Sequence, residues 1–485
     1  MTSIFGTDGI RGRVGEWPMT PEFFLKLGKI IGVVLPAEAR EKLVLIGRDT
    51  RLSGIMLQQA FTSGILSSGV KVVDLGVIPT AAVARLVRHY EAKIGVVISA
   101  SHNPADQNGI KFFDEHGEKL SEITELTIEK YILGEVKIGE LLYEKQEIGD
   151  IINGELLHHD YLMDLLSEHP VRFLEGLTIL VDCSNGSAYK IAPQIFGLAG
   201  ANVITINASP SGNNINVKSG SEYVRRSPSV FHELIRLLGA DFGLAFDGDA
   251  DRVVFVDEEG SLIDGDHILG LLARYLDRKN QLLARTIVTS NMRNNGLKEF
   301  LEASGISVLE TPVGDKYIIE KIAELKSGNA ANEKIGLGGE QAGHVVLIDD
   351  KFTTGDGIRT ALFLIRAYLE SHASSYSEFV SIINKTPQII ASAYVGQGTR
   401  LERSKLDELQ KQVLNSNQGL SRINLRYSGT EPVFRAMLEG DHRYTEQELA
   451  GIAIDICSKV QAAGNIVGGE IDILNCSRGG VISNV

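Results

Sequence analysis

An internal repeat is the sequence feature that most constrains how this chain can fold. Three times, an apolar stretch with helical periodicity ends in small residues and a glycine, and a β-branched strand resumes directly after it. The copies are 66–72 (LSSGVKV), 198–203 (LAGANV) and 303–308 (ASGISV). Glycine can adopt the left-handed conformation that closes a helix, which explains its place in each copy. Copies about a hundred residues or more apart indicate duplication of a whole domain rather than a solenoid.

Around each copy the pattern predicts strand, helix, strand, helix and strand. The predicted strands are 43–47, 71–75 and 94–99, then 177–183, 202–206 and 242–246, then 285–289, 306–309 and 344–348. The predicted helices are 55–67, 80–90, 187–198, 228–238, 267–277 and 316–326. Such alternation is typical of mainly parallel sheets with helices on their faces.

The pattern changes beyond about residue 375. Strands near 389–395, 421–427 and 433–438 precede a helix that opens at Thr445, with Glu448 three residues later as in a capping box. The Gly-rich residues 466–485 have a weak pattern, and the sequence assigns them no role. We therefore predict an α/β protein with three similar mixed-sheet α/β domains and a smaller α+β C-terminal domain. The predicted domains are 1–155, 156–258, 259–375 and 376–485.

Composition excludes several classes of protein. The net charge of −14 over 485 residues argues against a nucleic-acid binder, although a local group of Arg and Lys can still bind an anionic substrate. The first residues lack the basic and apolar regions of a signal peptide, and no apolar run approaches the ~18 residues of a membrane span. Cys183, Cys457 and Cys476 have neither disulfide nor zinc spacing. We expect a soluble cytoplasmic protein and leave a homodimer open.

The sharpest motif is the acidic segment 247–252 (DGDADR), between two apolar strands. Asp247, Asp249 and Asp251 offer three carboxylates at alternate positions, and oxygen ligands of this kind suit a hard cation such as Mg²⁺. A calcium-binding EF-hand is the competing interpretation, because Glu258 stands at its twelfth position. Arg252 occupies the sixth position, where glycine is needed, so this alternative fails. A solvated acidic turn is the remaining structural interpretation.

A second motif follows the predicted strand at 94–99, where a polar loop contains Ser99, Ser101, His102 and Asn103. Loops at the carboxyl ends of strands are where α/β sheets bind ligands. A nucleophilic serine is one interpretation, and a polar turn that ends a strand is the other. The spacing does not choose between Ser99 and Ser101.

Three further segments contain groups that bind anions or sugars. Segment 425–432 (LRYSGTEP) and Arg435 combine guanidinium groups, hydroxyls and glycine, which suits a phosphate, but the Gly-Lys-Ser/Thr of a nucleotide P-loop is absent. A plain hairpin is the alternative. The glycine-rich loop 338–344 displays Glu340 and His344, and the stretch 5–12 carries Arg11. Lys111 follows the serine loop at a distance that returns it to the same site.

Taken together, these motifs identify the chain as resembling one family. FGTDGIRG, ISASHNP, DGDADR, GGEQAGH and RYSGTEP, in this order, resemble the α-D-phosphohexomutases. Segments 47–54 (GRDTRLSG), 108–120 (NGIKFFDEHGEKL) and 311–317 (TPVGDKY) look most like the bacterial branch that acts on hexosamine phosphate. The resemblance implies four domains around a central cleft and the interconversion of glucosamine 6-phosphate and glucosamine 1-phosphate, through a phosphoserine enzyme and a bisphosphate intermediate.

The resemblance also implies a role for each matching residue. Ser101 would carry the phosphoryl group and, with Asp247, Asp249 and Asp251, bind Mg²⁺. His102, Lys111 and Arg11 would assist transfer, with the proton-accepting base either Lys111 or His102. The residues expected to bind substrate are Arg252, Glu340, His344, Arg426, Ser428, Gly429, Thr430 and Arg435.

The chain departs from the pattern of that branch at four positions. Ala342 stands where the sugar loop usually has Ser, and Ser211, Ser219 and Tyr223 stand where Asp, Cys and His are usual. Two rival functions follow: a phosphomannomutase or phosphoglucomutase of the same family, and a non-catalytic phosphosugar-binding paralogue.

Overall fold

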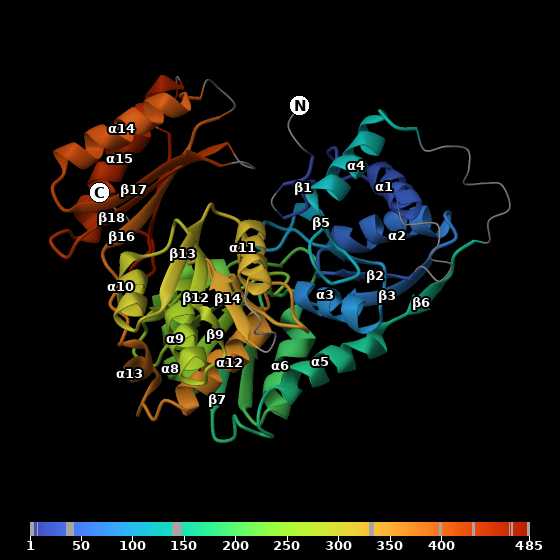
Figure 1. The fold of residues 1–485 in the computed structure, drawn as a ribbon, viewed down its shortest axis with the longest axis horizontal. Coiled ribbons are helices and arrows are strands. Elements are labelled where there is room, and N and C mark those ends of the chain that lie inside the picture. Colours follow the sequence, from blue (N-terminus) through green and yellow to red (C-terminus); the bar gives the residue numbers. More distant parts are fainter. Residues whose placement is uncertain are drawn as a thin grey trace.

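The chain folds around four β-sheets, which follow one another along the sequence (Figure 1). The computed structural model describes residues 4–6, 8–34, 43–137, 148–328, 334–396, 400–428, 432–464, 466 and 469–482. In Figure 1 the first sheet is blue and lies at the right, and the fourth, in orange and red, lies at the upper left. The second and third sheets lie between and below them.

The first sheet has the strand order β1-β5-β4-β2-β3-β6. Its strands are β1 (Ile10–Arg13), β2 (Leu43–Arg48), β3 (Lys71–Val77), β4 (Ile94–Ile98), β5 (Gln107–Phe113) and β6 (Ile151–Asn153). Its helices are α1 (Pro21–Val34), α2 (Leu52–Leu66), α3 (Thr80–His89) and α4 (Glu122–Leu133). The short helix η2 (Glu155–Leu157) and α5 (His158–Ser167) lead into the second sheet.

The second sheet has the order β11-β10-β9-β7-β8. Its strands are β7 (Thr178–Asp182), β8 (Asn202–Ile206), β9 (Phe242–Phe246), β10 (Val253–Val256) and β11 (Leu262–Ile263). Its helices are α6 (Ala188–Leu198), α7 (Gly220–Arg226) and α8 (Pro228–Leu238).

The third sheet has the order β13-β12-β14-β15. Its strands are β12 (Leu282–Ser290), β13 (Ser307–Thr311), β14 (Ile335–Gly339) and β15 (Val345–Ile348). Its helices are α9 (Gly265–Arg278), α10 (Asn295–Ala303), α11 (Asp315–Ser327), α12 (Gly357–Leu369) and α13 (Tyr376–Val380).

One four-stranded unit recurs in these three sheets. In each, three parallel strands are followed by an antiparallel fourth, in the orders β5-β4-β2-β3, β10-β9-β7-β8 and β15-β14-β12-β13. The internal repeat therefore corresponds to a triplicated mixed α/β unit, and the predicted fold class is confirmed. The hairpin between the third and fourth strands occupies the same position in every copy.

The fourth sheet is antiparallel, with the order β17-β18-β16-β19. Its strands are β16 (Gln388–Tyr394), β17 (Leu420–Tyr427), β18 (Val433–Gly440) and β19 (Ile471–Asn475), and its helices are α14 (Arg403–Ser416) and α15 (Glu446–Ala463). The predicted capping box opens α15: Glu448 N–H donates to the Thr445 hydroxyl, and the Glu448 carboxylate accepts from Thr445 N–H at 2.8 Å.

Hydrophobic packing joins the three repeated units. A single cluster of buried side chains includes Val83 on α3, Phe246 on β9 and Leu337 on β14. The fourth sheet has a core of its own, in which Ile456 of α15 packs against Phe434 of β18. No helix among the described residues is long and apolar enough to cross a membrane.

The third unit differs from its prediction in two ways. The segment at 344–348 forms the antiparallel strand β15, and the third parallel strand is β14, which the pattern missed. The segment of β14 reads IGLGG, and glycine is unfavourable in strands. Here Gly336 and Gly338 allow Ile322 and Ile318 of α11 to pack against the backbone, since a Cβ at either position would lie within 2.6 Å of those side chains. The helix between β12 and β13 is α10, whereas the predicted helix at 267–277 is α9 and precedes β12.

Candidate active site

Three loops in equivalent positions of the three repeated units form the candidate site. They are the hairpins between β4 and β5, between β9 and β10, and between β14 and β15, and they contain the serine, acidic and glycine-rich motifs. Each loop begins at the carboxyl end of a parallel strand, the side on which α/β sheets bind ligands. Contacts between the loops bring the three motifs together.

The serine loop presents Ser101 to the acidic loop. The Ser101 hydroxyl is fully buried and donates to Asp247 Oδ2 at 2.5 Å, and His102 Nδ1 lies 3.4 Å from the same hydroxyl. Ser101 has φ = 52°, which turns the chain sharply after β4. The Ser99 hydroxyl donates instead to Asp49 Oδ2 at 2.7 Å, away from the acidic loop. Of the two serines that spacing left open, Ser101 is therefore the one that faces the carboxylates.

Arg51 holds the serine loop in this shape. Its guanidinium is buried and donates to the carbonyl oxygens of Ser101 at 2.9 Å, Asn103 at 2.8 Å and Gln107 at 3.0 Å. It also forms a 2.8 Å ion pair with Asp49, in which both side chains are fully buried. One planar cation thus organises most of the carbonyl groups of the loop, a task suited to the rigid guanidinium fork.

The acidic loop fits a hard cation. One oxygen of each of Asp247, Asp249 and Asp251 lies within 4.8 Å of the others, and all three side chains are buried. Asp249 Oδ1 and Asp251 Oδ1 accept no hydrogen bond from the described residues. Buried carboxylate oxygens without donors are costly unless a cation binds them. The donor set therefore fits a hard divalent ion.

Glycine at position 248 is required by the approach of the serine loop. A Cβ built at Gly248 would lie 2.5 Å from the Ser101 carbonyl oxygen. On the other side of the acidic loop, the Thr80 hydroxyl donates to Asp249 Oδ2 at 2.7 Å, and Thr80 N–H donates to the Asp249 carbonyl oxygen at 3.0 Å. The first unit thus holds the acidic loop from both sides.

The aspartates have different electrostatic environments. Burial, followed by the charges of Asp251 and Asp249, raises the pKa of Asp247 well above its ordinary value. Burial also acts to raise the pKa of Asp249, but the Lys111 ammonium outweighs it, so the pKa of Asp249 is lowered. Repulsion among the carboxylates raises the pKa of Asp247, whereas attraction to the lysine lowers the pKa of Asp249.

Lys111 connects the acidic loop with the N-terminal segment. Its ammonium nitrogen lies 2.8 Å from both Asp249 Oδ2 and Asp8 Oδ2, and 3.2 Å from Asp251 Oδ2. Burial acts to lower the pKa of Lys111, but these carboxylates raise it well above its ordinary value. Lys111 is thus a charged ammonium in a buried position, which suits the neutralisation of negative charge.

A chain of ion pairs continues from Asp8 to the third unit. Lys119 lies 2.8 Å from Asp8 Oδ1 and 2.5 Å from Asp315 Oδ2, and His344 Nε2 lies 3.8 Å from Asp315 Oδ2. Asp8 also pairs with Arg11. Alternating charges of this kind tie the first and third units together across the site.

Two arginines set the charge around His102. The cation of Arg252, then burial, and then Arg11 lower the pKa of His102 well below its ordinary value. Arg11 Nη1 also donates to Asn103 Oδ1 at 3.4 Å, and Arg252 N–H donates to Asp247 Oδ1 at 3.2 Å. The two cations and burial therefore favour the neutral form of the His102 imidazole.

The glycine-rich loop, residues 338–344, is joined directly to the acidic loop. Arg252 and His344 form a backbone bridge, and Val253 N–H donates to the Gly343 carbonyl oxygen at 3.1 Å. His344 is buried beside Asp315, and the Glu340 carboxylate accepts from Gly314 N–H at 3.1 Å. The loop therefore presents a carboxylate and an imidazole near the serine and acidic loops.

The fourth sheet contributes a pair of arginines. Arg426 on β17 and Arg435 on β18 are cross-strand neighbours, and Ser428 N–H donates to the Val433 carbonyl oxygen at 2.8 Å. Burial and then Arg435 lower the pKa of Arg426, whereas Glu340 acts in the opposite direction. The arginine pair therefore lies within electrostatic range of the glycine-rich loop. Gly429 and Thr430, which the sequence also assigned to this site, lie outside the described residues.

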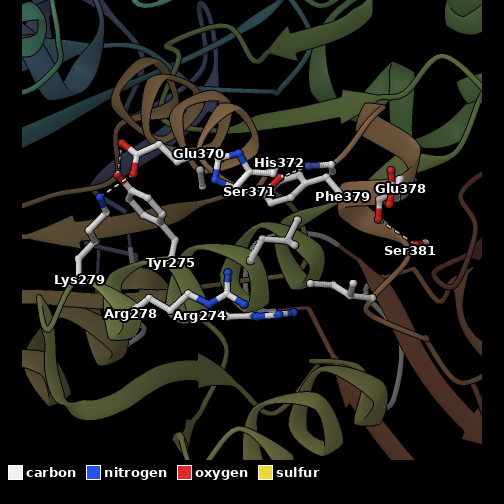
Figure 2. Close-up of a pocket in the computed structure, with 14 residues that line it drawn as sticks. Arg274, Tyr275, Arg278, Lys279, Glu370, Ser371, His372, Glu378, Phe379 and Ser381 are labelled. Carbon is white, nitrogen blue, oxygen red and sulfur yellow. Dashed lines mark hydrogen bonds and ion pairs between the residues drawn. The ribbon is translucent and has the colours of Figure 1, made fainter.

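A hollow of about 530 Å³ lies elsewhere, on the third unit (Figure 2). It lies at the C-terminal ends of α9 and α12, where basic side chains favourably face the negative end of a helix dipole. Two of its charged groups have partners in the protein: Lys279 pairs with Glu370 at 2.6 Å, and the Arg274 guanidinium lies 6.0 Å from the centre of the Phe300 ring. None of the residues of the serine, acidic or glycine-rich loops lines this hollow.

Sequence reasoning missed several residues of the site. Asp8, Arg51, Lys119 and Asp315 lie inside segments that carry the family resemblance, but sequence reasoning assigned none of them a role, and Thr80 lies outside those segments. The available signal was a charged residue within each Gly-rich or turn-rich segment. Only the contacts show that these charges pair with one another.

Comparisons with known proteins agree with this architecture. Family models for the phosphoglucomutase/phosphomannomutase alpha/beta/alpha domains I, II and III match residues 2–137, 160–260 and 264–386. Among solved structures, a phosphoglucomutase/phosphomannomutase family protein from Burkholderia thailandensis is similar, with a TM-score of 0.72 and 22% identity over 97% of this chain and 99% of that one. N-acetylphosphoglucosamine mutase from Aspergillus fumigatus, solved with GlcNAc-6P and magnesium, has a TM-score of 0.61 and 17% identity over 95% of this chain and 96% of that one.

Fold, family models and site together define a phosphohexomutase, an isomerase of carbohydrate metabolism. Curated relatives narrow the family further. The phosphoglucosamine mutase of Clostridioides difficile is 40% identical over 93% of this chain and 97% of that protein, and that of Carboxydothermus hydrogenoformans is 42% identical over 92% and 97%. The chain belongs to the phosphoglucosamine mutase family.

Proposed function

We propose that the enzyme interconverts glucosamine 6-phosphate and glucosamine 1-phosphate in the cytoplasm, supplying a precursor of amino-sugar and cell-wall synthesis. The names of the curated relatives support this substrate. One observation carries the proposal: the Ser101 hydroxyl lies 2.5 Å from Asp247, inside a buried group of three carboxylates. A buried serine hydroxyl beside carboxylates suits a carrier whose phosphate would be neutralised by a bound cation.

We propose Mg²⁺ as the bound cation, held by Asp247, Asp249, Asp251 and the phosphorylated side chain of Ser101. The Oδ1 atoms of Asp249 and Asp251, which accept no hydrogen bond from the described residues, support this assignment. When bound, Mg²⁺ would neutralise charge on the phosphoryl group. Phosphoryl transfer depends on this neutralisation and on in-line positioning.

The first transfer places a second phosphate on the sugar. The bond between phosphorus and the Ser101 oxygen breaks as the free hydroxyl oxygen of glucosamine 6-phosphate bonds to phosphorus, which gives a bisphosphate. The proton of that sugar hydroxyl passes to His102, whose Nδ1 lies 3.4 Å from the Ser101 oxygen, and from there to this leaving oxygen. Lys111 and Arg11 add positive charge around the transferring group.

The second transfer returns a phosphate to Ser101. The bisphosphate turns over, and its other phosphate bonds to the Ser101 oxygen as the bond from phosphorus to the sugar oxygen breaks. The proton of the Ser101 hydroxyl passes through His102 to that sugar oxygen. The product is glucosamine 1-phosphate, and the enzyme is again phosphorylated. Atoms therefore balance over the cycle without any external phosphate donor.

Binding of the non-reacting phosphate, away from Ser101, would allow the site to accept the sugar in both orientations. Glu340, His344 and Arg252 would bind the sugar, and Arg426, Ser428, Gly429, Thr430 and Arg435 would bind the phosphate that does not react. Guanidinium groups bind phosphate through paired hydrogen bonds and do not distinguish the 1-position from the 6-position. The same arginine pair can therefore serve both half-reactions.

The test is the phosphorylation state of Ser101 together with turnover. Intact-mass analysis with site mapping should find phosphate on Ser101 in part of the purified protein. Ser101→Ala should lose nearly all mutase activity, whereas Ser99→Ala should retain phosphorylation at residue 101. Full activity in Ser101→Ala would refute the carrier role.

Comparing substrates tests the preferred sugar. Turnover should be faster with glucosamine 6-phosphate than with mannose 6-phosphate or glucose 6-phosphate at equal concentration. A preference for either of the others would make the protein a phosphomannomutase or phosphoglucomutase. Binding of all three without isomer formation would identify a non-catalytic paralogue.

A further inference from the structure

A fully connected polar cluster is buried where the third and fourth sheets meet. Its members, called here the polar joint, are Asp264, Asp266, Asn294, Gln341, Lys385 and Gln388. Asp266, Asn294 and Gln388 have no exposed surface. Buried polar groups destabilise a fold unless they are hydrogen-bonded, so the bonds within this cluster favour one relative arrangement of the two sheets, although Asp266 Oδ1 and Gln341 Oε1 accept no hydrogen bond from the described residues.

The glycine-rich loop takes part in the joint through Gln341, the neighbour of Glu340. Gln341 Nε2 donates to Asp266 Oδ2 at 2.8 Å and to Gln388 Oε1 at 2.7 Å. Gln388 is the first residue of β16 in the fourth sheet. A single amide therefore connects the loop that carries Glu340 to the sheet that carries the arginine pair.

Gln388 is anchored on every polar atom of its side chain. Its Nε2 donates to the carbonyl oxygens of Met292 and Arg293, each at 3.2 Å, and its Oε1 also accepts from Asn294 Nδ2 at 3.4 Å. Its backbone N–H donates to the Ser477 hydroxyl at 2.7 Å. The side chain of Gln388 thus fixes the start of β16 against the third unit.

A buried cation pairs with both aspartates of the joint. Lys385 lies 2.6 Å from Asp264 Oδ2 and 3.3 Å from Asp266 Oδ2, and it donates to the Cys476 carbonyl oxygen at 2.7 Å. Burial acts to lower the pKa of Lys385, but the aspartates raise it. A buried ion pair of this kind contributes a defined geometry more than net stability.

The strands β17 and β18 contact the third unit at the ends that lie away from the arginine pair. Arg435 and Glu439 are four residues apart on β18 and therefore lie on the same face, about 13 Å apart along the strand. Glu439 accepts from Asn295 N–H at 2.5 Å, and its cross-strand partner Arg422 donates to the Arg293 carbonyl oxygen at 2.6 Å. One face of the sheet is thus anchored at one end and carries the arginine pair at the other.

We propose that Gln341 and Gln388 are positioning residues, which hold the arginine pair of the fourth sheet at a set distance from Glu340. The inference rests on the proposed function, because it concerns how the sugar and its distal phosphate are bound together. A sugar phosphate must contact Glu340 and the arginine pair at the same time. A small rotation at the polar joint is magnified along β17 and β18, so the joint determines whether both contacts form.

The experiment compares Gln341→Leu, Gln388→Leu and the double variant with the wild type. A matched control is Gln461→Leu, because Gln461 is also buried in the fourth domain and donates one hydrogen bond, to Tyr394, outside the joint. For each protein we would measure kcat and KM for glucosamine 6-phosphate. Hydrolysis of the Ser101 phosphate without sugar would be measured as a reaction that does not use the fourth sheet.

Both single variants should lower kcat/KM at least tenfold, mainly by raising KM, and the double variant should be no worse than about the worse single variant. Gln461→Leu should stay within twofold of the wild type. Hydrolysis of the Ser101 phosphate should be unchanged in all of them. If Gln388→Leu does not fold, Gln341→Leu decides the question alone, because it lies in the glycine-rich loop.

Two results would overturn the positioning role: a folded Gln341→Leu protein with KM within twofold of the wild type, or single effects that multiply in the double variant. Failure of the proposed function is recognised separately, in the wild type. If the wild type prefers another hexose phosphate, the variants are compared on that substrate. If it turns over none, the tenfold loss is expected in the affinity for glucosamine 6-phosphate, measured by calorimetry.

Discussion

Replacing Arg51 by methionine should disorder the loop that carries Ser101. The guanidinium of Arg51 is the shared donor for the carbonyl oxygens of Ser101 and Asn103, and it neutralises the buried Asp49. Methionine has a similar length but carries no donor and no charge. The substitution therefore removes the electrostatic contacts while keeping most of the volume.

The magnitude follows from the burial of the ion pair. Removing one partner of a buried pair costs about 3–5 kcal/mol, because the other charge remains buried and unpaired. Asp49 would be that charge, since neither side chain of the pair is exposed. A domain has a stability of about 5–15 kcal/mol. For a unit of about 150 residues, 1 kcal/mol shifts the melting temperature by roughly 2–4 °C, so Arg51→Met should lower it by about 6–20 °C.

Calorimetry at neutral pH checks this value, with Arg13→Met as the control. Arg13 belongs to the same unit, but about two thirds of its side chain is exposed and its ion pairs are 3.4 Å and 3.8 Å long. A surface pair contributes about 0–1 kcal/mol, so the control should melt within about 4 °C of the wild type. Adding Asp49→Asn to Arg51→Met should recover part of the loss, because no buried charge then lacks a partner.

Mutase activity and Ser101 phosphorylation should fall in Arg51→Met even at temperatures where the protein is folded. Two results would refute this prediction: Arg51→Met melting within about 2 °C of the wild type, or the double variant Arg51→Met/Asp49→Asn melting at a lower temperature than Arg51→Met alone. Either result would mean that the pair is not what stabilises the serine loop.

The remaining predictions concern the metal, pH and the C-terminal strand. Asp249→Ala should abolish both turnover and Mg²⁺ binding measured by calorimetry, and a variant that still bound the ion with wild-type affinity would contradict the proposed site. Burial lowers the pKa of His169 to about 3 from 6.5, so the unfolded chain binds the proton first as the pH falls, and stability is lost below about pH 6.5. Between pH 6.5 and pH 5, the free energy of unfolding should therefore fall by about 2 kcal/mol less in His169→Leu than in the wild type, as measured by denaturant titration. Equal decreases in the two proteins would refute this prediction. Asp472→Ala removes an ion pair with Arg226 in which both side chains are about one third exposed. The free energy of unfolding should therefore fall by less than about 1 kcal/mol. A larger decrease would mean that the attachment of β19 through this pair contributes more to stability than a surface ion pair does.

The periodic elements of the repeated units could be predicted because their signals are local. The strand at 202–206 and the helix at 228–238 have the predicted bounds, since apolar periodicity and a closing glycine mark them. Elements without such signals were missed. On α14, Leu406 is the one buried residue, and β19 lies in a Gly-rich tail whose strand forms by pairing with β16.

The sequence also determined the chemistry that each loop can supply. Three carboxylates at alternate positions indicated a cation site. The polar loop after β4 left a nucleophilic serine and a plain turn open, and the family resemblance implied the serine carrier. The spacing left Ser99 and Ser101 equivalent, because both stand in the same loop with the same side chain. The direction of each hydroxyl depends on the backbone, and Ser101 alone has the left-handed φ that turns it to Asp247.

Only the tertiary structure decided which charges are partners. Asp8, Lys119 and Asp315 are far apart along the chain, and no periodicity relates them, yet they form one line of ion pairs. Gln341 and Gln388 belong to different sheets in the same way. Local patterns specify helices, strands and turns through backbone geometry and burial, whereas such pairings depend on how completed sheets pack. The motifs that carry the candidate chemistry could therefore be predicted from the sequence, whereas their arrangement and the charged residues that join them could not.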